Sequence, residues 1–552
     1  MSGGRFRNFR GRPCGSAALA GALGLALLSA CAPEAQLPDL KQIYQRAASA
    51  EGAGPARRPL IAIPGTLGSR LVDRVSGRAI WGGGSRGISA DPEDPEEYAL
   101  IALPIPKGDE PFSALVDTVE PDGVLETAEA EVLGIPININ VYGEALGVLA
   151  EGGFRVQRGL RRFRSGGDRD GIEEDLFDAV LPVRAEPALA PKPEPAPESA
   201  FDTFQFDYDW RRDLVETAHK FGRFLQERRA RVAAQRGVPE AEVKFDLLAH
   251  SMGTLISRYF LMYGFAEPPS GSATTLPPIT WAGAEFFSRV VFVAPPNSGS
   301  ILALDNLING KELGPLQPVY PPALLASHVS TYQLLPRAHH RRVLKNGAPV
   351  TGLFDAALWE AMGWGLFAPD AEAELALMMP DEPSPERRLD RARAYTKRLL
   401  NRAEIFHRMM DSWGPPPAGL DLFLVVGGGF ETPATAEIDP ESGVFQITGF
   451  EEGDGVVLRA SALADGRQDG DLTTGFRSHL RFKTTLFLPD EHVELTRNRV
   501  FGDNLLFWLL EAPRGGTNLA RPANTGLLGN VSSGRQAISD APVPLSPTSP
   551  DR

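Results

Sequence analysis

The feature that most constrains the fold of this 552-residue chain is a serine between a strand-like run and a helical pattern. The apolar run at residues 243–248 leads into Ala249-His-Ser251-Met-Gly253, and a helical pattern extends from 254 to about 263. A serine at such a corner sits on strained backbone, and the strand and helix approach closely only if the residues two before and two after it are small. Ala249 and Gly253 meet this requirement, although glycine is usual at the first position. We interpret Ser251 as the candidate nucleophile of a strand–turn–helix elbow; the alternative is an ordinary helix N-cap.

A literal G-x-S-x-G motif occurs elsewhere, at residues 83–87, with Ser85 at its centre. No apolar run precedes this motif and no helical pattern follows it. Because the chemistry depends on the strand–turn–helix geometry rather than on the letters, we interpret Ser85 as a loop serine.

Apolar runs of strand length alternate with helical patterns along much of the chain. The runs PLIAI at 59–63, VVFV at 290–293 and LFLVV at 422–426 are continuously apolar, as expected for strands covered on both faces. This alternation predicts an α/β protein with a mainly parallel central sheet. Together with the elbow at Ser251, it predicts an α/β-hydrolase fold.

The predicted hydrolase domain covers residues 59–512. The regions at about 87–199 and 301–414 read as insertions, helical or irregular, and we expect them to form two caps over the sheet. The segment 513–552 is rich in Pro, Gly, Ser and Asn, a composition that predicts a disordered tail.

A serine hydroxyl is a weak nucleophile until a base takes its proton, and the base needs an acid to hold its tautomer. In α/β-hydrolases the chain order is Ser, acid, His. Asp454 lies in an acidic turn past the strand at 422–426, and His492 precedes an apolar-periodic helical stretch. We expect Asp454 to be the acid and His492 the base. The alternative for Asp454 is a plain turn aspartate, and His479 competes with His492, although its strand-like surroundings are less typical of a triad base.

The tetrahedral intermediate of acyl transfer needs two backbone N–H donors. The loop at residues 64–69, Pro-Gly-Thr-Leu-Gly-Ser, follows the first apolar run, and its glycines let the backbone approach a substrate carbonyl. We expect the N–H groups of Thr66 and Met252 to form this oxyanion hole; the alternative for the loop is a plain turn.

Composition excludes several other classes of function. The chain has 70 acidic and 56 basic residues, a formal net charge of −14, so it lacks an electrostatic footprint for nucleic acid. Its eight scattered histidines and two cysteines show no zinc-ligand spacing, and no Gly-x4-Gly-Lys-Ser/Thr loop is present. We therefore expect neither a metal nor another cofactor.

The first thirty residues have the pattern of an export signal. Four arginines precede an apolar stretch at 16–28. Thirteen residues rise about 20 Å as a helix, less than the roughly 30 Å hydrocarbon core of a bilayer. Residues 1–30 are therefore predicted to be a signal peptide rather than a membrane span.

The end of this signal, Leu28-Ser-Ala-Cys31, resembles a bacterial lipobox. The resemblance implies that Cys31 becomes an acylated N-terminus, that residues 31–58 form a tether, and that alanine at position 32 directs the protein to the outer membrane. Two or three acyl chains suffice for stable membrane anchoring.

Four segments resemble the lecithin:cholesterol acyltransferase family, which includes a lysosomal phospholipase/transacylase. They are Pro64-Gly-Thr-Leu-Gly-Ser69, Tyr208-Asp-Trp-Arg211, Ala249-His-Ser-Met-Gly253, and Gly453-Asp-Gly-Val-Val457 paired with His492. The tetrapeptide at 208–211 is the most distinguishing of them. The resemblance implies a hydrolase fold whose caps form an acyl-chain pocket, and it implies that 208–211 is a structural motif with an Asp209–Arg211 ion pair beside a buried Trp210.

Such enzymes move a fatty acyl group from a phospholipid to serine and then to an alcohol or water. We therefore expect a lipid-anchored serine acyltransferase or phospholipase with a lipid ester as its substrate. One departure from the family is Ala-Pro-Pro-Asn-Ser-Gly-Ser at 294–300, where members often have Thr-Pro-Trp-Gly-Gly-Ser. The alternatives are a carboxylesterase or polyester depolymerase that uses water only, and a non-catalytic surface lipoprotein. The oligomeric state stays open.

Overall fold

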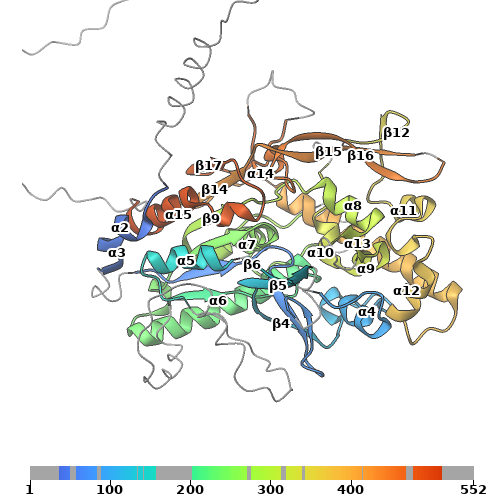
Figure 1. Ribbon diagram of the computed structural model, residues 1–552, viewed down its shortest axis with the longest axis horizontal. Helices are drawn as coiled ribbons and strands as arrows, with labels where there is room; N and C mark the ends of the chain where they lie inside the picture. The colour runs from blue at the N-terminus through green and yellow to red at the C-terminus, as the bar shows by residue number, and fades with distance from the viewer. Residues whose placement is uncertain are drawn as a thin grey trace, which may run out of the picture. The chain divides into compact units, whose positions relative to one another are not determined.

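A six-stranded sheet lies at the centre of the fold, with the strand order β17-β14-β9-β8-β1-β7 (Figure 1). Every neighbouring pair in it is parallel. Its strands are β1 (Leu60–Ile63), β7 (Thr203–Gln205), β8 (Phe245–His250), β9 (Phe287–Val293), β14 (Asp421–Gly427) and β17 (Thr484–Leu488). The three apolar runs seen in the sequence form β1, β9 and β14, and the predicted α/β-hydrolase fold is confirmed.

This computed structural model describes only part of the chain. The described residues are 37–49, 57–83, 89–132, 135–140, 142–156, 202–269, 275–312, 319–337, 342–412, 414–439, 441–467 and 476–512. They all lie in the first of two units, which ends at Gly515. The expected signal peptide, Cys31, Ser85 and the expected tail at 513–552 lie outside them. Within the described ranges, no helix combines the length and apolar character that a membrane span requires.

Alternate residues of the central strands enter two separate cores, because successive side chains of a strand point to opposite faces. In β14, Leu422, Leu424 and Val426 enter one core, whereas Phe423 and Val425 enter the other. The first face is covered by α6 (Leu214–Arg236) and α7 (Met252–Tyr263). The second is covered by α2 (Leu40–Ile43), α5 (Gly143–Glu151) and α15 (Arg499–Leu506). Burial on both faces explains why these strands are continuously apolar.

Two helices of the second face differ from the sequence-based expectation. Helix α5 lies within the region expected to be the first cap, yet its Leu146 and Leu149 pack in the sheet core. Helix α2 lies in the expected tether, yet Leu40 and Tyr44 are buried beside α15, and the Tyr44 hydroxyl donates to the Asp503 carbonyl at 2.8 Å. Leu40 and Tyr44 lie four residues apart on one helical face. The alanine- and glutamate-rich composition around them does not indicate a packed helix.

The rest of the first insertion and the loop before it form small sheets beside the core. They contain β2 (Ser69–Asp73), β3 (Ala79–Trp81), α4 (Pro95–Ile101), β4 (Val119–Val124), β5 (Thr127–Val132) and β6 (Ile135–Asn140). Strands β2, β3 and β4 form one antiparallel sheet, and β5 and β6 form another.

The second insertion is mainly helical. Its elements are α8 (Ile301–Asn309), β10 (Lys311–Glu312), β11 (Val319–Tyr320), α9 (Pro322–Ser327), α10 (Val329–Gln333), β12 (Arg342–Lys345), β13 (Ala348–Pro349), α11 (Ala356–Met362), α12 (Ala371–Met378) and α13 (Pro385–Met410). Its buried hydrophobic residues belong to the first core, so the insertion packs directly against the central sheet's first face. A hairpin of β15 (Phe430–Ile438) and β16 (Phe445–Gly453), followed by α14 (Arg459–Ala462), then leads back to the sheet.

The packing of α2 can be tested with a pair of substitutions in one helix. Leu40 is fully buried, whereas Ile43 is 51% exposed. Leu40→Ala should lower the free energy of unfolding by about 2–4 kcal/mol, because it leaves a cavity in the second core. Ile43→Ala should change it by less than about 0.5 kcal/mol. Equal urea midpoints for the two variants would show that α2 does not pack on the fold.

Candidate active site

Ser251 lies at the sharp turn between β8 and α7. Its backbone has φ 51° and ψ −126°, a conformation that a residue with a side chain rarely adopts. The Ser251 N–H donates to the Val293 carbonyl at 2.9 Å, which ties the turn to β9. A Cβ on Gly253 would lie 2.3 Å from the Pro64 carbonyl oxygen, so only glycine lets the start of α7 approach the loop after β1. The small-residue pattern of the sequence follows from this contact.

Loops at the carboxyl ends of three parallel strands bring Ser251, His492 and Asp454 together. The His492 Nε2 lies 2.8 Å from the Ser251 hydroxyl oxygen, and the His492 Nδ1 lies 2.8 Å from a carboxylate oxygen of Asp454. The His492 N–H also donates to the Asp454 carbonyl at 3.0 Å. Because a carboxylate only accepts, Nδ1 carries the proton, and the lone pair of Nε2 faces the serine hydroxyl. In this tautomer the imidazole can accept the serine proton.

Asp454 does not directly follow β14. The hairpin β15–β16 intervenes, and the chain then returns so closely that a Cβ on Gly427, the last residue of β14, would lie 2.5 Å from the Asp454 Cβ. The second carboxylate oxygen accepts from the N–H groups of Val456 and Val457 at 3.0 and 2.7 Å. Burial alone would raise the pKa of Asp454, but the charge and hydrogen bond of His492 and these two amides hold it below the ordinary value. The carboxylate is therefore an anion at neutral pH.

The competing histidine, His479, lies elsewhere. It is placed beside the Met410 backbone and Arg258, and burial, followed by the charge of Arg258, lowers its pKa to about 4. His328 and His407 contact the backbone carbonyls of Ile101 and Gln333. His339 and His340 lie outside the described residues. Of the described histidines after position 251, His492 is the one whose ring contacts the serine hydroxyl.

A cavity of about 780 Å³ opens at Ser251. This volume is within the range of roughly 300–1,000 Å³ that small-molecule sites occupy. Thr66 lines the cavity, and Met252 occupies the first position of α7, where amides have no partner within the helix. Val456 and Val493, which are 38% and 39% exposed, form part of its rim. Its apolar walls include Leu67, Trp81, Trp210, Leu302, Val319, Leu325 and Leu334.

One basic side chain faces this largely apolar space. Among the described residues that line the cavity, Lys311 of β10 is the sole lysine or arginine. Burial lowers its pKa below the ordinary value. Two acidic residues, Asp305 and Glu312, line the same cavity.

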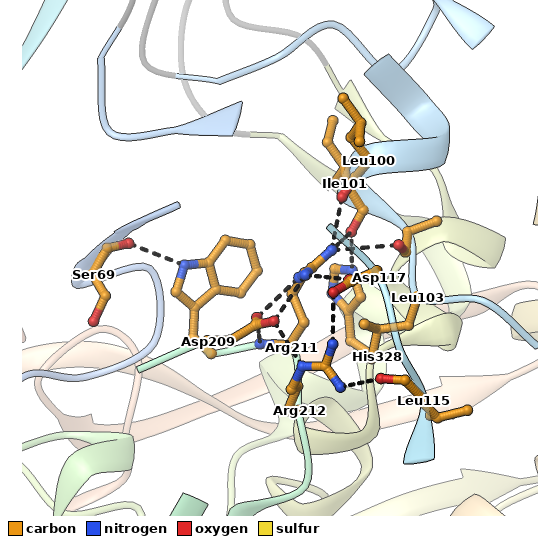
Figure 2. Close-up of polar contacts among 12 residues, drawn as sticks. Ser69, Leu100, Ile101, Leu103, Leu115, Asp117, Asp209, Arg211, Arg212 and His328 are labelled. Carbon is orange, nitrogen blue, oxygen red and sulfur yellow. Dashed lines mark hydrogen bonds and ion pairs between the residues drawn. The ribbon is translucent and has the colours of Figure 1, made fainter. Parts of the chain in front are cut away.

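The motif at 208–211 braces the loop that carries Thr66. The Tyr208 hydroxyl donates to the Pro64 carbonyl at 2.9 Å. The Trp210 indole donates to the Ser69 carbonyl at 3.3 Å (Figure 2). These two bonds hold the loop at both ends, which is the structural role that the family resemblance implied.

Arg211 joins this motif to the first insertion. Its guanidinium is fully buried and donates to both carboxylate oxygens of Asp209, at 2.9 and 2.8 Å, and to Asp117 at 2.7 Å (Figure 2). It also donates to the carbonyls of Leu100 and Ile101 in the last turn of α4. Burial alone would raise the pKa of Asp209, but the charge of Arg211 holds it well below the ordinary value. The expected ion pair is thus present and forms part of a larger clamp.

Sequence reasoning missed two residues of this site, Tyr142 and His250. The Tyr142 hydroxyl lies 2.7 Å from the His250 Nδ1, although 108 residues separate them. His250 stands inside the elbow motif, which could have drawn attention to it. Tyr142 has no local pattern that distinguishes it.

Residues 202–364 match the family model for lecithin:cholesterol acyltransferase. The matched range contains both the tetrapeptide at 208–211 and the elbow at Ser251. The resemblance inferred from the sequence is confirmed over that range. The family match and the arrangement of the site together support an esterase-type enzyme. No curated protein matches the chain.

Several solved structures also match parts of the chain. The Tle4–Tli4 complex matches with 14% identity, 83% of this chain and 100% of that chain covered, and a TM-score of 0.45. The lipase BlEst2 of Bacillus licheniformis in its propeptide form matches with 13% identity, coverage of 58% and 46%, and a TM-score of 0.24. EstA from Clostridium botulinum matches with 12% identity, coverage of 50% and 66%, and a TM-score of 0.21.

The clamp can be tested by removing its central cation. Arg211→Ala should lower the free energy of unfolding at pH 7 by about 3–5 kcal/mol, because two buried carboxylates lose one of the two arginines, Arg211 and Arg212, that pair with them. The depressed pKa of Asp209 means that the pairing stabilises the fold above the ordinary aspartate pKa of about 4 and fades below it. The difference from wild type should therefore shrink in urea titrations below about pH 4.

The control is Arg393→Ala, which removes exposed pairs with Glu360 and Asp390 and should leave the urea midpoint close to that of wild type. A similar small loss for Arg211→Ala would contradict the clamp.

Proposed function

We propose that this protein is a serine-dependent O-acyltransferase or phospholipase that moves a fatty acyl group from a lipid ester to an alcohol or to water. The observation that carries the proposal is the hydrogen-bonded chain Ser251–His492–Asp454 at the base of the cavity. Each of its bonds has the distance and direction that proton transfer from a serine requires.

In the first half-reaction the Ser251 oxygen attacks the ester carbonyl while its proton passes to the His492 Nε2. The tetrahedral intermediate collapses, the carbon–oxygen bond to the leaving alcohol breaks, and His492 returns the proton to that oxygen. In the second half-reaction the acceptor alcohol or water gives its proton to His492 and attacks the acyl-serine. The bond between the carbonyl carbon and the Ser251 oxygen then breaks, and His492 returns the proton to that oxygen. Asp454 stays ionised throughout and stabilises the imidazolium.

The amides of Thr66 and Met252 stabilise the oxyanion in this proposal. The preceding N–H in the loop, that of Gly65, is already bound by the Tyr142 hydroxyl at 2.8 Å. Thr66 is therefore the next donor that the loop offers to the cavity. Met252 stands at the positive end of α7, where the aligned peptide dipoles favour negative charge.

The walls of the cavity support an amphiphilic substrate. Apolar side chains cover most of the space, which suits an acyl chain, and Lys311 suits an anionic headgroup such as phosphate. The lipobox-like segment supports export and anchoring to the bacterial outer membrane through acylated Cys31. An anchored enzyme meets lipid esters in the surface to which it is attached.

The catalytic assignment is tested with acyl-labelled phosphatidylcholine, offered with and without a long-chain alcohol or sterol. Ser251→Ala and His492→Ala should each lower kcat by about 10⁴-fold or more, because triad members act as a unit. His479→Ala is the matched control and should keep activity near wild type. If wild type is inactive on both short- and long-chain esters, the protein is a non-catalytic lipoprotein and the proposal is wrong. Label that appears only as free fatty acid, whatever alcohol is offered, would identify a carboxylesterase or depolymerase that uses water.

The role of Lys311 separates a phospholipid donor from a neutral ester. Lys311→Met should raise KM about tenfold for a phospholipid in mixed micelles, because the headgroup loses its buried partner, and should leave KM for diolein unchanged. Lys220→Met, on the outer face of α6, serves as the control for loss of one positive charge. An equal change in KM for both substrates would contradict headgroup recognition.

A further inference from the structure

A chain of three hydrogen bonds runs beside the triad, from the loop after β1 to the loop that carries the base, and its two side chains, Tyr142 and His250, also line the cavity. The Gly65 N–H donates to the Tyr142 hydroxyl at 2.8 Å. That hydroxyl lies 2.7 Å from the His250 Nδ1. The His250 Nε2 lies 3.1 Å from the His492 carbonyl oxygen. The chain therefore connects the loop proposed to hold the oxyanion with the residue proposed to be the base.

The two ends of this chain determine where its protons lie. A backbone N–H can only donate, so the Tyr142 oxygen accepts from Gly65 and its own hydrogen is directed to the His250 Nδ1. A backbone carbonyl can only accept, so the His250 Nε2 must carry a proton. The other neutral tautomer would place two lone pairs against each other at 3.1 Å. Of the two neutral tautomers, only the one protonated at Nε2 satisfies all three bonds.

The charges around His250 favour the same neutral form. Burial, followed by the charge of His492, lowers the pKa of His250 to about 3, against smaller opposing effects of the bond to the His492 carbonyl and of the Asp454 charge. The ring centroids of His250 and His492 are 5.0 Å apart. Because His492 must become a cation when it takes the serine proton, a second cation at this distance would oppose the reaction.

The same bond completes the support of the base. The His492 N–H is held by the Asp454 carbonyl, its Nδ1 by the Asp454 carboxylate, and its carbonyl by His250. His250 is the neighbour of Ser251 in the chain, so a single peptide unit and this bond connect the nucleophile with the base. Tyr142 extends the support to Gly65, on which a Cβ would lie 2.7 Å from the Ser251 Cβ.

We propose that Tyr142 and His250 are positioning residues, whose ordered hydrogen bonds hold the loop of Thr66 and the loop of His492 in register around Ser251. Neither side chain exchanges a proton with the substrate. They act on the rate of acyl transfer by fixing where the base and the oxyanion donors stand before the substrate arrives. The kinetic consequence rests on the proposed function, whereas the position of the protons does not.

The kinetic test compares three variants with wild type on a soluble ester. Tyr142→Phe and His250→Phe should each lower kcat about 10- to 100-fold with KM within twofold, because a misplaced base costs rate rather than binding. His250→Gln should recover most of that loss, since its amide N–H₂ can still donate to the His492 carbonyl. The double Phe variant should be no slower than the worse single variant if the two residues act in one chain.

The matched control is Tyr259→Phe. This buried tyrosine of α7 donates to the Ala266 carbonyl at 2.7 Å and lies outside the residues that line the cavity. It should lower stability by a similar amount and leave kcat unchanged. Full kcat in a folded Tyr142→Phe variant, or no recovery with His250→Gln, would overturn the proposal. If His250→Phe does not fold, Tyr142→Phe still tests the proposal, because it keeps the aromatic ring and removes only the hydroxyl.

A second measurement does not depend on activity. Two-bond ¹H–¹⁵N NMR of the histidine-labelled protein, assigned with His250→Gln, should show His250 as the Nε2–H tautomer without titration between pH 5 and 8. The Nδ1–H tautomer, or titration in that range, would overturn the proposal even in an active enzyme. If wild type neither hydrolyses an ester nor transfers an acyl group while His250 shows the expected tautomer, the proposed function fails and the hydrogen-bond arrangement stands.

Discussion

The strained backbone of Ser251 depends on close contacts among the three central strands. A residue with a side chain holds φ 51° there only because the surrounding structure permits no relaxation. The Ser251 N–H is bound to β9, and Gly65 and Gly253 bring the loop after β1 into contact with the turn and the first residues of α7. A side chain at either glycine would push the loop after β1 away from this turn. The sheet order therefore places the nucleophile, and it does so at the edge where the carboxyl ends of the parallel strands meet.

Two networks of opposite character hold the loop at 64–69. On one side, Tyr208 and Trp210 bind the loop, and the buried charges of Asp209, Arg211 and Asp117 fix their segment to the first insertion. Removing such charges from water costs free energy, so a buried network of this kind adds little net stability. Its effect is to select one arrangement of the groups that it joins. On the other side, the uncharged pair of Tyr142 and His250 borders the base. A charged network in that second position would act on the imidazolium that forms at His492, so a neutral pair suits a residue that must gain and lose a proton.

Much of the fold was predictable because its signals are local. Strands buried on both faces are continuously apolar, and those at 59–63, 290–293 and 422–426 were recognised for that reason. The expectations for α2 and α5 were incomplete, since Leu40 and Leu149 gain their meaning only from the second core, to which distant segments contribute. The hairpin β15–β16 between the strand and Asp454 could not be predicted either. The sequence of an acidic turn does not indicate whether the turn follows the strand directly or comes after an inserted hairpin.

The sequence by itself determined the elbow. The strand, the small residues around Ser251 and the helix are neighbours in the chain, and their sterics require one local geometry. It also supplied Asp454 and His492 as candidates by chain order. Only the tertiary structure decided that these groups meet, that His479 lies elsewhere, and that Tyr142 and His250 stand behind the base. The partners in these contacts are 38 to 242 residues apart. The packing of helices on the two faces of the sheet sets their distances, and no local pattern in the sequence encodes that packing.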